Sequence, residues 1–98
     1  MKKVIIVFED DYNDCDIILV PDFVADQPEK FCQMFFRWLE SEDLPDEYYV
    51  FINGEKSISA ETVGLVNWLN EYICPSNEQA RIIEQHIKFK DGFPVMEF

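Results

Sequence analysis

Apolar residues in this chain form short unbroken runs near its start and helix-spaced sets further on. Residues 3–8 and 17–20 are dominated by β-branched side chains, a pattern typical of strands that are buried on both faces. Residues 48–52 predict a third strand, which ends at an Asn-Gly pair that favours a tight turn. Residues 93–98 predict a last strand, and Pro94 would place it at the edge of a sheet.

Three segments carry helix signals. Asp26 and Glu29 have the spacing of a capping box, with a proline between them in the first turn, and Ser76 and Gln79 repeat that spacing. The predicted helices cover about residues 27–40, 59–73 and 76–86. The resulting order, β-β-α-β-α-α-β, predicts one α/β domain over residues 1–98, with a sheet of about four strands and helices packed on it.

The first predicted helix has an unusually wide apolar surface. At 100° per residue its apolar side chains cover an arc of roughly 200°, and they are Phe31, Cys32, Met34, Phe35, Phe36, Trp38 and Leu39. A helix that packs on one face of a sheet needs a narrower apolar arc. We therefore expect a second helix to pack on the arc, the alternative being that its margin is exposed as a binding patch.

Composition limits the classes of partner. The chain of 98 residues has a net charge of −12, which disfavours direct binding to nucleic acid or to anionic membranes, because both require basic side chains. Thirteen acidic and four basic residues fall in residues 1–47, so the negative field belongs mainly to the first half. Three cysteines without a C-x-x-C pair suit reduced thiols and predict a cytoplasmic location.

The stretch FEDDYNDCD, residues 8–16, concentrates five carboxylates between two apolar runs. An EF-hand starting at Asp11 would place Cys15 and Asp16 where an oxygen ligand and glycine are required, so we predict no metal site. The preceding residues, KKVIIVFEDD, resemble the first strand and acidic pair of bacterial receiver domains. That resemblance implies magnesium-dependent phosphorylation, but the helix and strand that a receiver needs next are missing, which excludes it.

Catalytic groups are sparse in the sequence. His86, the only histidine, is predicted to lie near a helix end, and the three glycines are too scattered to hold a phosphate. We therefore predict no enzymatic activity and no cofactor.

Binding to a basic protein is the function that remains. In general character the chain resembles bacterial toxin-immunity proteins, which implies inhibition of a toxic nuclease. The alternatives are an adaptor domain that forms a homodimer, with acidity serving solubility, and a metal-dependent enzyme. The predicted partner-binding residues form two acidic segments beside strands, and they are Glu9, Asp10, Asp11, Tyr12, Asp14, Asp16, Glu42, Asp43, Asp46, Glu47 and Tyr48.

Overall fold

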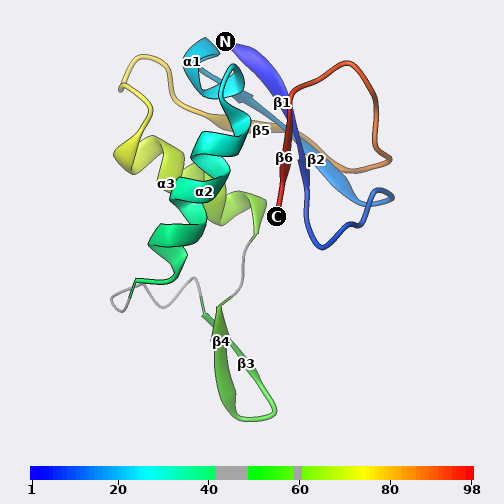
Figure 1. The fold of residues 1–98 in the computed structure, drawn as a ribbon, viewed down its shortest axis with the longest axis vertical. Coiled ribbons are helices and arrows are strands. Elements are labelled where there is room, and N and C mark those ends of the chain that lie inside the picture. Colours follow the sequence, from blue (N-terminus) through cyan, green and yellow to red (C-terminus); the bar gives the residue numbers. More distant parts are fainter. Residues whose placement is uncertain (42–48, 59–60) are drawn as a thin grey trace.

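The computed structural model describes residues 1–41, 49–58 and 61–98 (Figure 1). Its Cα radius of gyration of 13.4 Å is the value expected for one compact domain of this length. The described elements are β1 (Lys2–Val7), β2 (Cys15–Val20), α1 (Asp22–Ala25), α2 (Pro28–Leu39), β3 (Tyr49–Ile52), β4 (Glu55–Ile58), α3 (Thr62–Tyr72), β5 (Arg81–Ile87) and β6 (Val95–Glu97). None of the described helices combines the length and the apolar composition that crossing a membrane requires.

Four strands form a mixed sheet in the order β5-β2-β1-β6. β1 pairs with β2 in antiparallel orientation and with β6 in parallel orientation, while β5 runs antiparallel to β2. The predicted α/β class, with a sheet of about four strands and helices packed on it, is confirmed. The prediction that the last strand lies at an edge is also confirmed, since β1 is the only described strand that pairs with β6.

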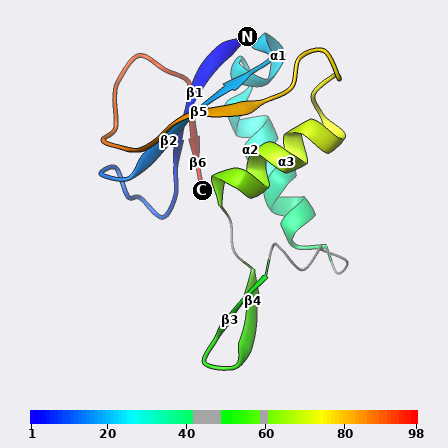
Figure 2. The same ribbon diagram turned by 180° about the vertical axis from the view of Figure 1, so that it is seen from behind.

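The two faces of the sheet are buried by different kinds of structure. Alternate side chains such as Val4, Ile6 and Met96 lie in one core with residues of α2 and α3, and both helices lie on the same side of the sheet (Figure 1). Figure 2 shows the same arrangement from behind. On the other face, Ile5 and Val7 are covered by partly buried residues of β5, β6 and the segment between them. Burial on both faces explains the unbroken apolar runs, although helices cover only one face.

α2 carries the wide apolar arc, and α3 packs against it as expected. Phe35 is fully buried and its ring centroid lies 5.4 Å from that of Trp68 in α3. The margin of the apolar arc is also exposed to solvent, because Phe36 is 39% exposed. The prediction that Asp26 caps this helix is wrong: Gln27 is the N-cap residue, and the Asp26 carboxylate accepts a hydrogen bond of 2.7 Å from Lys2.

The helix predicted over residues 76–86 is also wrong, since residues 81–87 form β5. The Gln79 side chain does not cap a helix but donates to the backbone carbonyls of Cys74 and Pro75. The Asn70 side chain bonds both the backbone N–H and the carbonyl of Ala80. These contacts direct the chain away from α3, and the β-branched residues that follow can then pair with β2.

The predicted strand at residues 48–52 is confirmed for its described part, β3. Asn53 and Gly54 both have positive φ, 52° and 80°, as a type I′ turn requires. β3 does not join the main sheet, however, but pairs with the unpredicted β4 in a separate two-stranded sheet, seen at the bottom of Figure 1. The short helix α1 was not predicted either, so the order of elements differs from the expected β-β-α-β-α-α-β.

Candidate functional site

Most of the acidic stretch, residues 8–14, forms the loop between β1 and β2, as predicted, and its last two residues begin β2. Glu9 and Asp10 have φ values of 53° and 56°, and the backbone N–H of Asp11 donates to the carbonyl of Phe8 at 3.0 Å. Two successive positive φ values are typical of a type I′ turn, which usually takes asparagine or glycine because other side chains are strained there. The backbone N–H of Glu9 also donates to the carbonyl of Phe98 at 2.8 Å, which holds the loop against the end of β6.

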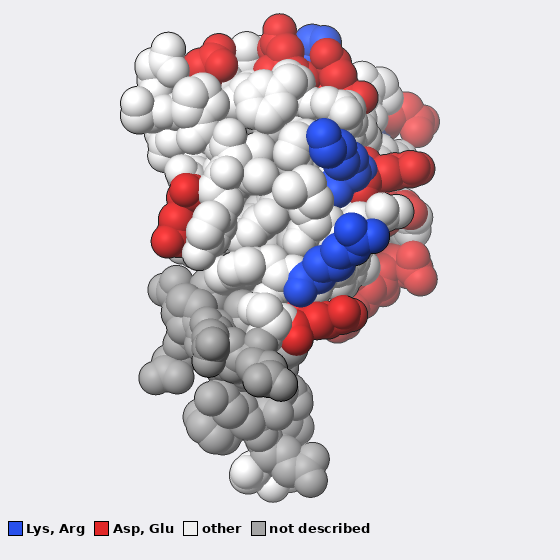
Figure 3. Space-filling view, turned by 60° about the vertical axis from the view of Figure 1, so that its left-hand side comes forward, with Lys and Arg blue, Asp and Glu red and all other residues white. Residues whose placement is uncertain are grey.

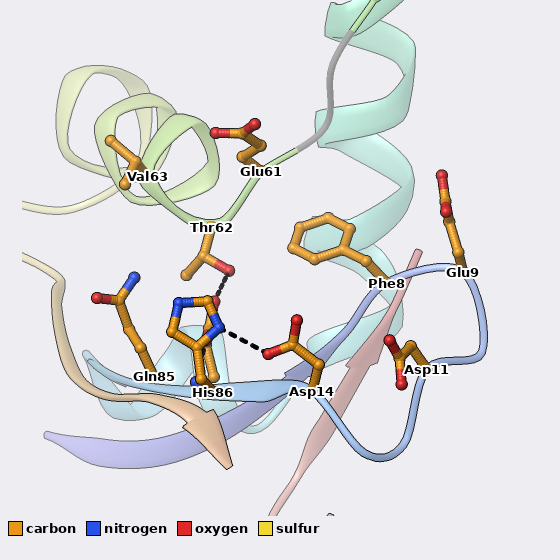
Figure 4. Close-up of a pocket in the computed structure, with 10 residues that line it drawn as sticks. Phe8, Glu9, Asp11, Asp14, Glu61, Thr62, Val63, Gln85 and His86 are labelled. Carbon is orange, nitrogen blue, oxygen red and sulfur yellow. Dashed lines mark hydrogen bonds and ion pairs between the residues drawn. The ribbon is translucent and has the colours of Figure 1, made fainter. Parts of the chain in front are cut away.

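One side of this loop opens into a pocket of about 540 Å³ (Figure 4). Its walls come from the loop, from the end of β5 and from the start of α3. Among the described residues that line it, the charged groups are carboxylates and the histidine, without a lysine or an arginine. The lining residues are Phe8, Glu9, Asp11, Asp14, Asp16, Glu61, Thr62, Val63, Gln85 and His86.

Asp16, in β2, connects three elements that are far apart in the sequence. One carboxylate oxygen accepts a short hydrogen bond from the Thr62 hydroxyl at the start of α3. The other accepts a hydrogen bond of 3.1 Å from the backbone N–H of His86 in β5. Thr62 is only 4% exposed, so its hydroxyl requires a partner inside the protein. Asp16 therefore holds the walls of the pocket in place before any ligand arrives.

A β-bulge brings Gln85 and His86 to the pocket. Cys15 lies opposite Ile87 and Ile17 lies opposite Glu84, so two residues of β5 stand opposite the single residue Asp16. The φ of His86 is 57°, in agreement with this irregularity. The prediction that His86 lies near a helix end is wrong.

The His86 ring pairs with an acidic residue of the loop. Its Nδ1 lies 2.8 Å from a carboxylate oxygen of Asp14, and the two side chains are 77% and 52% exposed. The hydrogen bond with Asp14, followed by the attraction of the Asp14 and Asp16 carboxylates, raises the pKa of His86 above its ordinary value of 6.5. Figure 4 shows the ring beside Asp14 at the mouth of the pocket.

This pairing predicts a measurable titration. Because the folded-state pKa is raised, the stabilisation from this contact is present below about pH 6.5, the ordinary histidine pKa, and is lost as the pH rises through the folded-state value. Asp14→Asn should return the pKa of His86 towards its ordinary value. The proton NMR signal of the single histidine gives both pKa values directly. Equal pKa values in the wild type and in Asp14→Asn would contradict the pairing.

The predicted partner-binding residues that the structure describes lie on both sides of the loop. Glu9, Asp11, Asp14 and Asp16 all line the pocket, whereas Asp10 belongs to the loop but not to the lining. Tyr12 faces away from it: its hydroxyl is hydrogen-bonded to the Glu97 carboxylate. The second predicted acidic segment lies outside the described residues, and it consists of Glu42, Asp43, Asp46, Glu47 and Tyr48.

Four polar lining residues were not predicted to bind a partner, namely Glu61, Thr62, Gln85 and His86. They reach the pocket only through the pairing of β5 with β2 and the placement of α3. The single histidine was the one sequence signal available, and its wrong assignment to a helix concealed it.

Three side chains that line the pocket have the geometry of possible metal ligands. Ligand atoms of Asp14, Asp16 and His86 lie within 4.8 Å of one another. The same groups already hold hydrogen bonds, since Asp16 binds Thr62 and the His86 backbone while Asp14 binds the His86 ring. A cation would compete with these contacts for the same side chains, and two carboxylates with one imidazole would leave it largely hydrated.

We therefore expect EDTA to leave the melting temperature of the protein unchanged. The hydrogen bonds among Asp14, Asp16, Thr62 and His86 stabilise the pocket without an ion. Differential scanning fluorimetry with and without chelator measures this. A lower melting temperature after chelation, restored by one divalent ion at micromolar concentration, would contradict the prediction.

The three thiols are poorly suited to catalysis. Cys15, Cys32 and Cys74 are all buried and free. Burial raises the pKa of all three thiols, that of Cys32 to about 12, so the reactive thiolate is scarce at neutral pH.

Apart from the His86 imidazole, the positive groups for which the described residues show an ion pair lie at the opposite end of β1 from the pocket. The amino group of Met1 pairs with Asp22, and Lys2 pairs with Asp26. On the face seen in Figure 3 the acidic side chains lie mainly around the margins and the centre is mostly uncharged. The pocket thus offers carboxylates to a positively charged group from outside.

No protein-family model, no curated protein and no solved structure matches the chain.

Proposed function

We propose that this protein binds and inhibits a basic enzyme, most simply as a bacterial immunity protein that neutralises a nuclease toxin. The observation that carries the proposal is the pocket lined by Glu9, Asp11, Asp14, Asp16 and Glu61, with no lysine or arginine among the lining residues that the structure describes. Carboxylates gathered in this way are a receptor for a cationic side chain of another molecule.

The chemistry of the pocket fits an arginine or lysine of the partner. Phe8 and Val63 supply apolar surface, against which the aliphatic stem of such a side chain can lie while its charged end reaches the carboxylates. Arginine is favoured, because a guanidinium forms paired hydrogen bonds with carboxylates. The contacts of Asp16 with Thr62 and His86 fix the walls in advance, which lowers the entropic cost of binding.

The net charge supports rapid recognition of such a partner. A charge of −12 attracts a basic protein over distances of about a Debye length, roughly 8–10 Å at physiological salt. The same field repels acidic competitors. Attraction of this kind acts chiefly on the association rate and weakens as salt rises.

The chemical groups suit an inhibitor that has no catalysis of its own. His86 is exposed and paired with Asp14, and the buried cysteines have raised pKa values. Free thiols are stable in a reducing compartment, which supports the proposal of a cytoplasmic location, where an immunity protein would protect its cell.

A homodimeric adaptor remains the second candidate, favoured by the exposed aromatic residues of the helices. Phe36 of α2 is 39% exposed and Tyr72 of α3 is 56% exposed. Sedimentation separates the two functions, since a dimer formed through an apolar helical face persists at high salt.

The experiment that tests the proposal is an inhibition assay. The partner is purified with the tagged protein at low salt, or expressed from the gene adjacent to its own, and its nuclease activity is measured. Equimolar addition of the protein should abolish that activity, and higher salt should slow the onset of inhibition. A co-purified partner that is acidic, or whose activity is unaffected by an excess of the protein, would contradict the proposal.

A further inference from the structure

A second cavity, of about 580 Å³, lies on the other side of the β1–β2 loop. Its floor is the edge strand β6, one wall is α2, and the opposite wall is formed by the loop and by the segment that leads from β5 to β6. Figure 1 shows β6 between α2 and that segment. We call this cavity the edge groove, and its lining residues are Tyr12, Glu29, Cys32, Gln33, Phe36, Phe89, Val95 and Glu97.

The hydrogen bonds of β6 show which of its backbone groups face the groove. Ile5 donates to the carbonyl of Pro94, and Phe98 donates to the carbonyl of Val7. In a parallel pair, alternate residues direct both their N–H and their C=O to the neighbouring strand. Residues 94, 96 and 98 therefore face β1, while Val95 and Glu97 direct their backbone groups to the open edge, where both line the groove.

Most of these edge groups have no partner in the described part of the chain. The carbonyl of Glu97 accepts a weak hydrogen bond of 3.8 Å from the Cys32 thiol. No acceptor among the described residues meets the N–H of Val95 or of Glu97, and no donor there meets the Val95 carbonyl. A row of such groups on an edge strand is a template for pairing with another extended chain.

The walls of the groove are held in place from within the protein. The Tyr12 hydroxyl is hydrogen-bonded to the Glu97 carboxylate. The Tyr12 and Phe89 rings pack edge to face, with their centroids 5.3 Å apart. The backbone N–H of Phe89 also donates to the Tyr12 carbonyl at 2.8 Å. On the opposite wall, the Phe36 ring lies 5.3 Å from that of Phe98. Aromatic surface and acidic side chains, from Glu29 and Glu97, thus face the space above the open edge.

We infer that the open edge of β6 takes up an extended segment of another protein as an added strand, with basic and apolar side chains alternating along that segment. The unpaired backbone groups specify an extended chain, since a helix cannot pair with them. Glu29 and Glu97 favour positive side chains and the aromatic walls favour apolar ones. A second copy of this chain fits poorly, because it would bring Glu97 towards acidic residues on a molecule of charge −12. This inference rests on the edge groove and does not require the acidic pocket to function.

Hydrogen exchange tests the premise without any ligand. The N–H groups of Met96 and Phe98 should exchange slowly because they are bonded to β1, whereas those of Val95 and Glu97 should exchange at least about tenfold faster. Uniform protection of all four would mean that the open edge is already covered, and would overturn the inference.

Binding is tested by NMR titration of the ¹⁵N-labelled protein with a pool of hexapeptides that alternate lysine or arginine with valine, isoleucine or phenylalanine. The expected result is a shift of the Val95, Glu97 and Gln33 amide signals, with increased protection of the two edge amides. The same pool methylated at alternate backbone nitrogens should bind about tenfold more weakly, because it lacks the matching donors. This control changes only the ligand and cannot affect folding.

Protein variants separate edge pairing from charge. Val95→Pro removes one edge donor without touching the bonds to β1, and should weaken binding about tenfold. Glu29→Gln should weaken binding severalfold at low salt, whereas Glu71→Gln, an equal charge change on α3 outside the groove, should not. The inference would be overturned if the methylated and unmethylated pools bound equally, or if peptide caused no shift at Val95 and Glu97. It would also be overturned if the Val95 and Glu97 signals shifted with protein concentration in the absence of peptide, because a second copy of the chain would then occupy the edge.

Discussion

Replacing Phe35 with alanine should lower the free energy of unfolding by about 3–5 kcal/mol, the usual cost of removing a large buried aromatic side chain. Phe35 is fully buried, and its ring lies between elements that bury one face of the sheet. Its centroid is 5.4 Å from that of Trp68, 5.7 Å from that of Phe98 and 6.2 Å from that of Trp38. The cavity would therefore open where α2, α3 and the end of β6 meet.

Urea denaturation measures the effect, and the neighbouring aromatic residue supplies the control. Phe36→Ala removes an equal side chain from the same helix, but Phe36 is 39% exposed, so the loss in the free energy of unfolding should be clearly smaller. Similar losses for the two variants would show that Phe35 does not anchor the contact between α2 and α3.

Neutralising the pocket should slow association with the basic partner by about tenfold or more at low salt. The variant Glu9→Gln, Asp11→Asn, Asp14→Asn removes three charges from the pocket while nearly preserving side-chain size. All three residues lie on the exposed loop, so the fold should be retained. The difference from wild type should shrink as sodium chloride rises, because salt screens exposed charges.

A matched variant distinguishes the pocket from net charge alone. Glu40→Gln, Glu71→Gln, Glu78→Gln also removes three exposed charges, and none of these residues lines either cavity. Stopped-flow measurement should give it a clearly smaller effect on the association rate than the pocket variant. Equal effects would mean that the partner responds to total charge and not to the pocket.

The elements that the sequence predicted correctly are those in which local pattern and burial agree. β1 and β2 are buried on both faces, so nearly every position in the core of each run is apolar, and α2 is amphipathic with a proline in its first turn. β5 was mistaken for a helix because Ser76 and Gln79 have capping-box spacing. That local signal was overridden when the Gln79 side chain bonded backbone carbonyls instead.

The pocket, too, could be predicted only in part from the sequence. Its loop side was predictable, because carboxylates between two buried strands must lie at the surface. Its other side depends on a β-bulge that places His86 opposite Asp16 and on the hydrogen bond from Thr62 to Asp16. Both contacts join residues that are 46 or more positions apart, and no local pattern specifies such pairs.

The most direct test of the proposed function is to map the contact by NMR on the ¹⁵N-labelled protein as its basic partner is added. Binding at the pocket predicts that the amide signals of Glu9, Asp11, Asp14, Thr62 and His86 shift or broaden first and most strongly. The pKa of His86 should change in the same titration, because a bound cation competes for Asp14. Changes confined to the exposed helical residues around Phe36 and Tyr72, with the loop signals and the His86 pKa unaltered, would contradict the proposal.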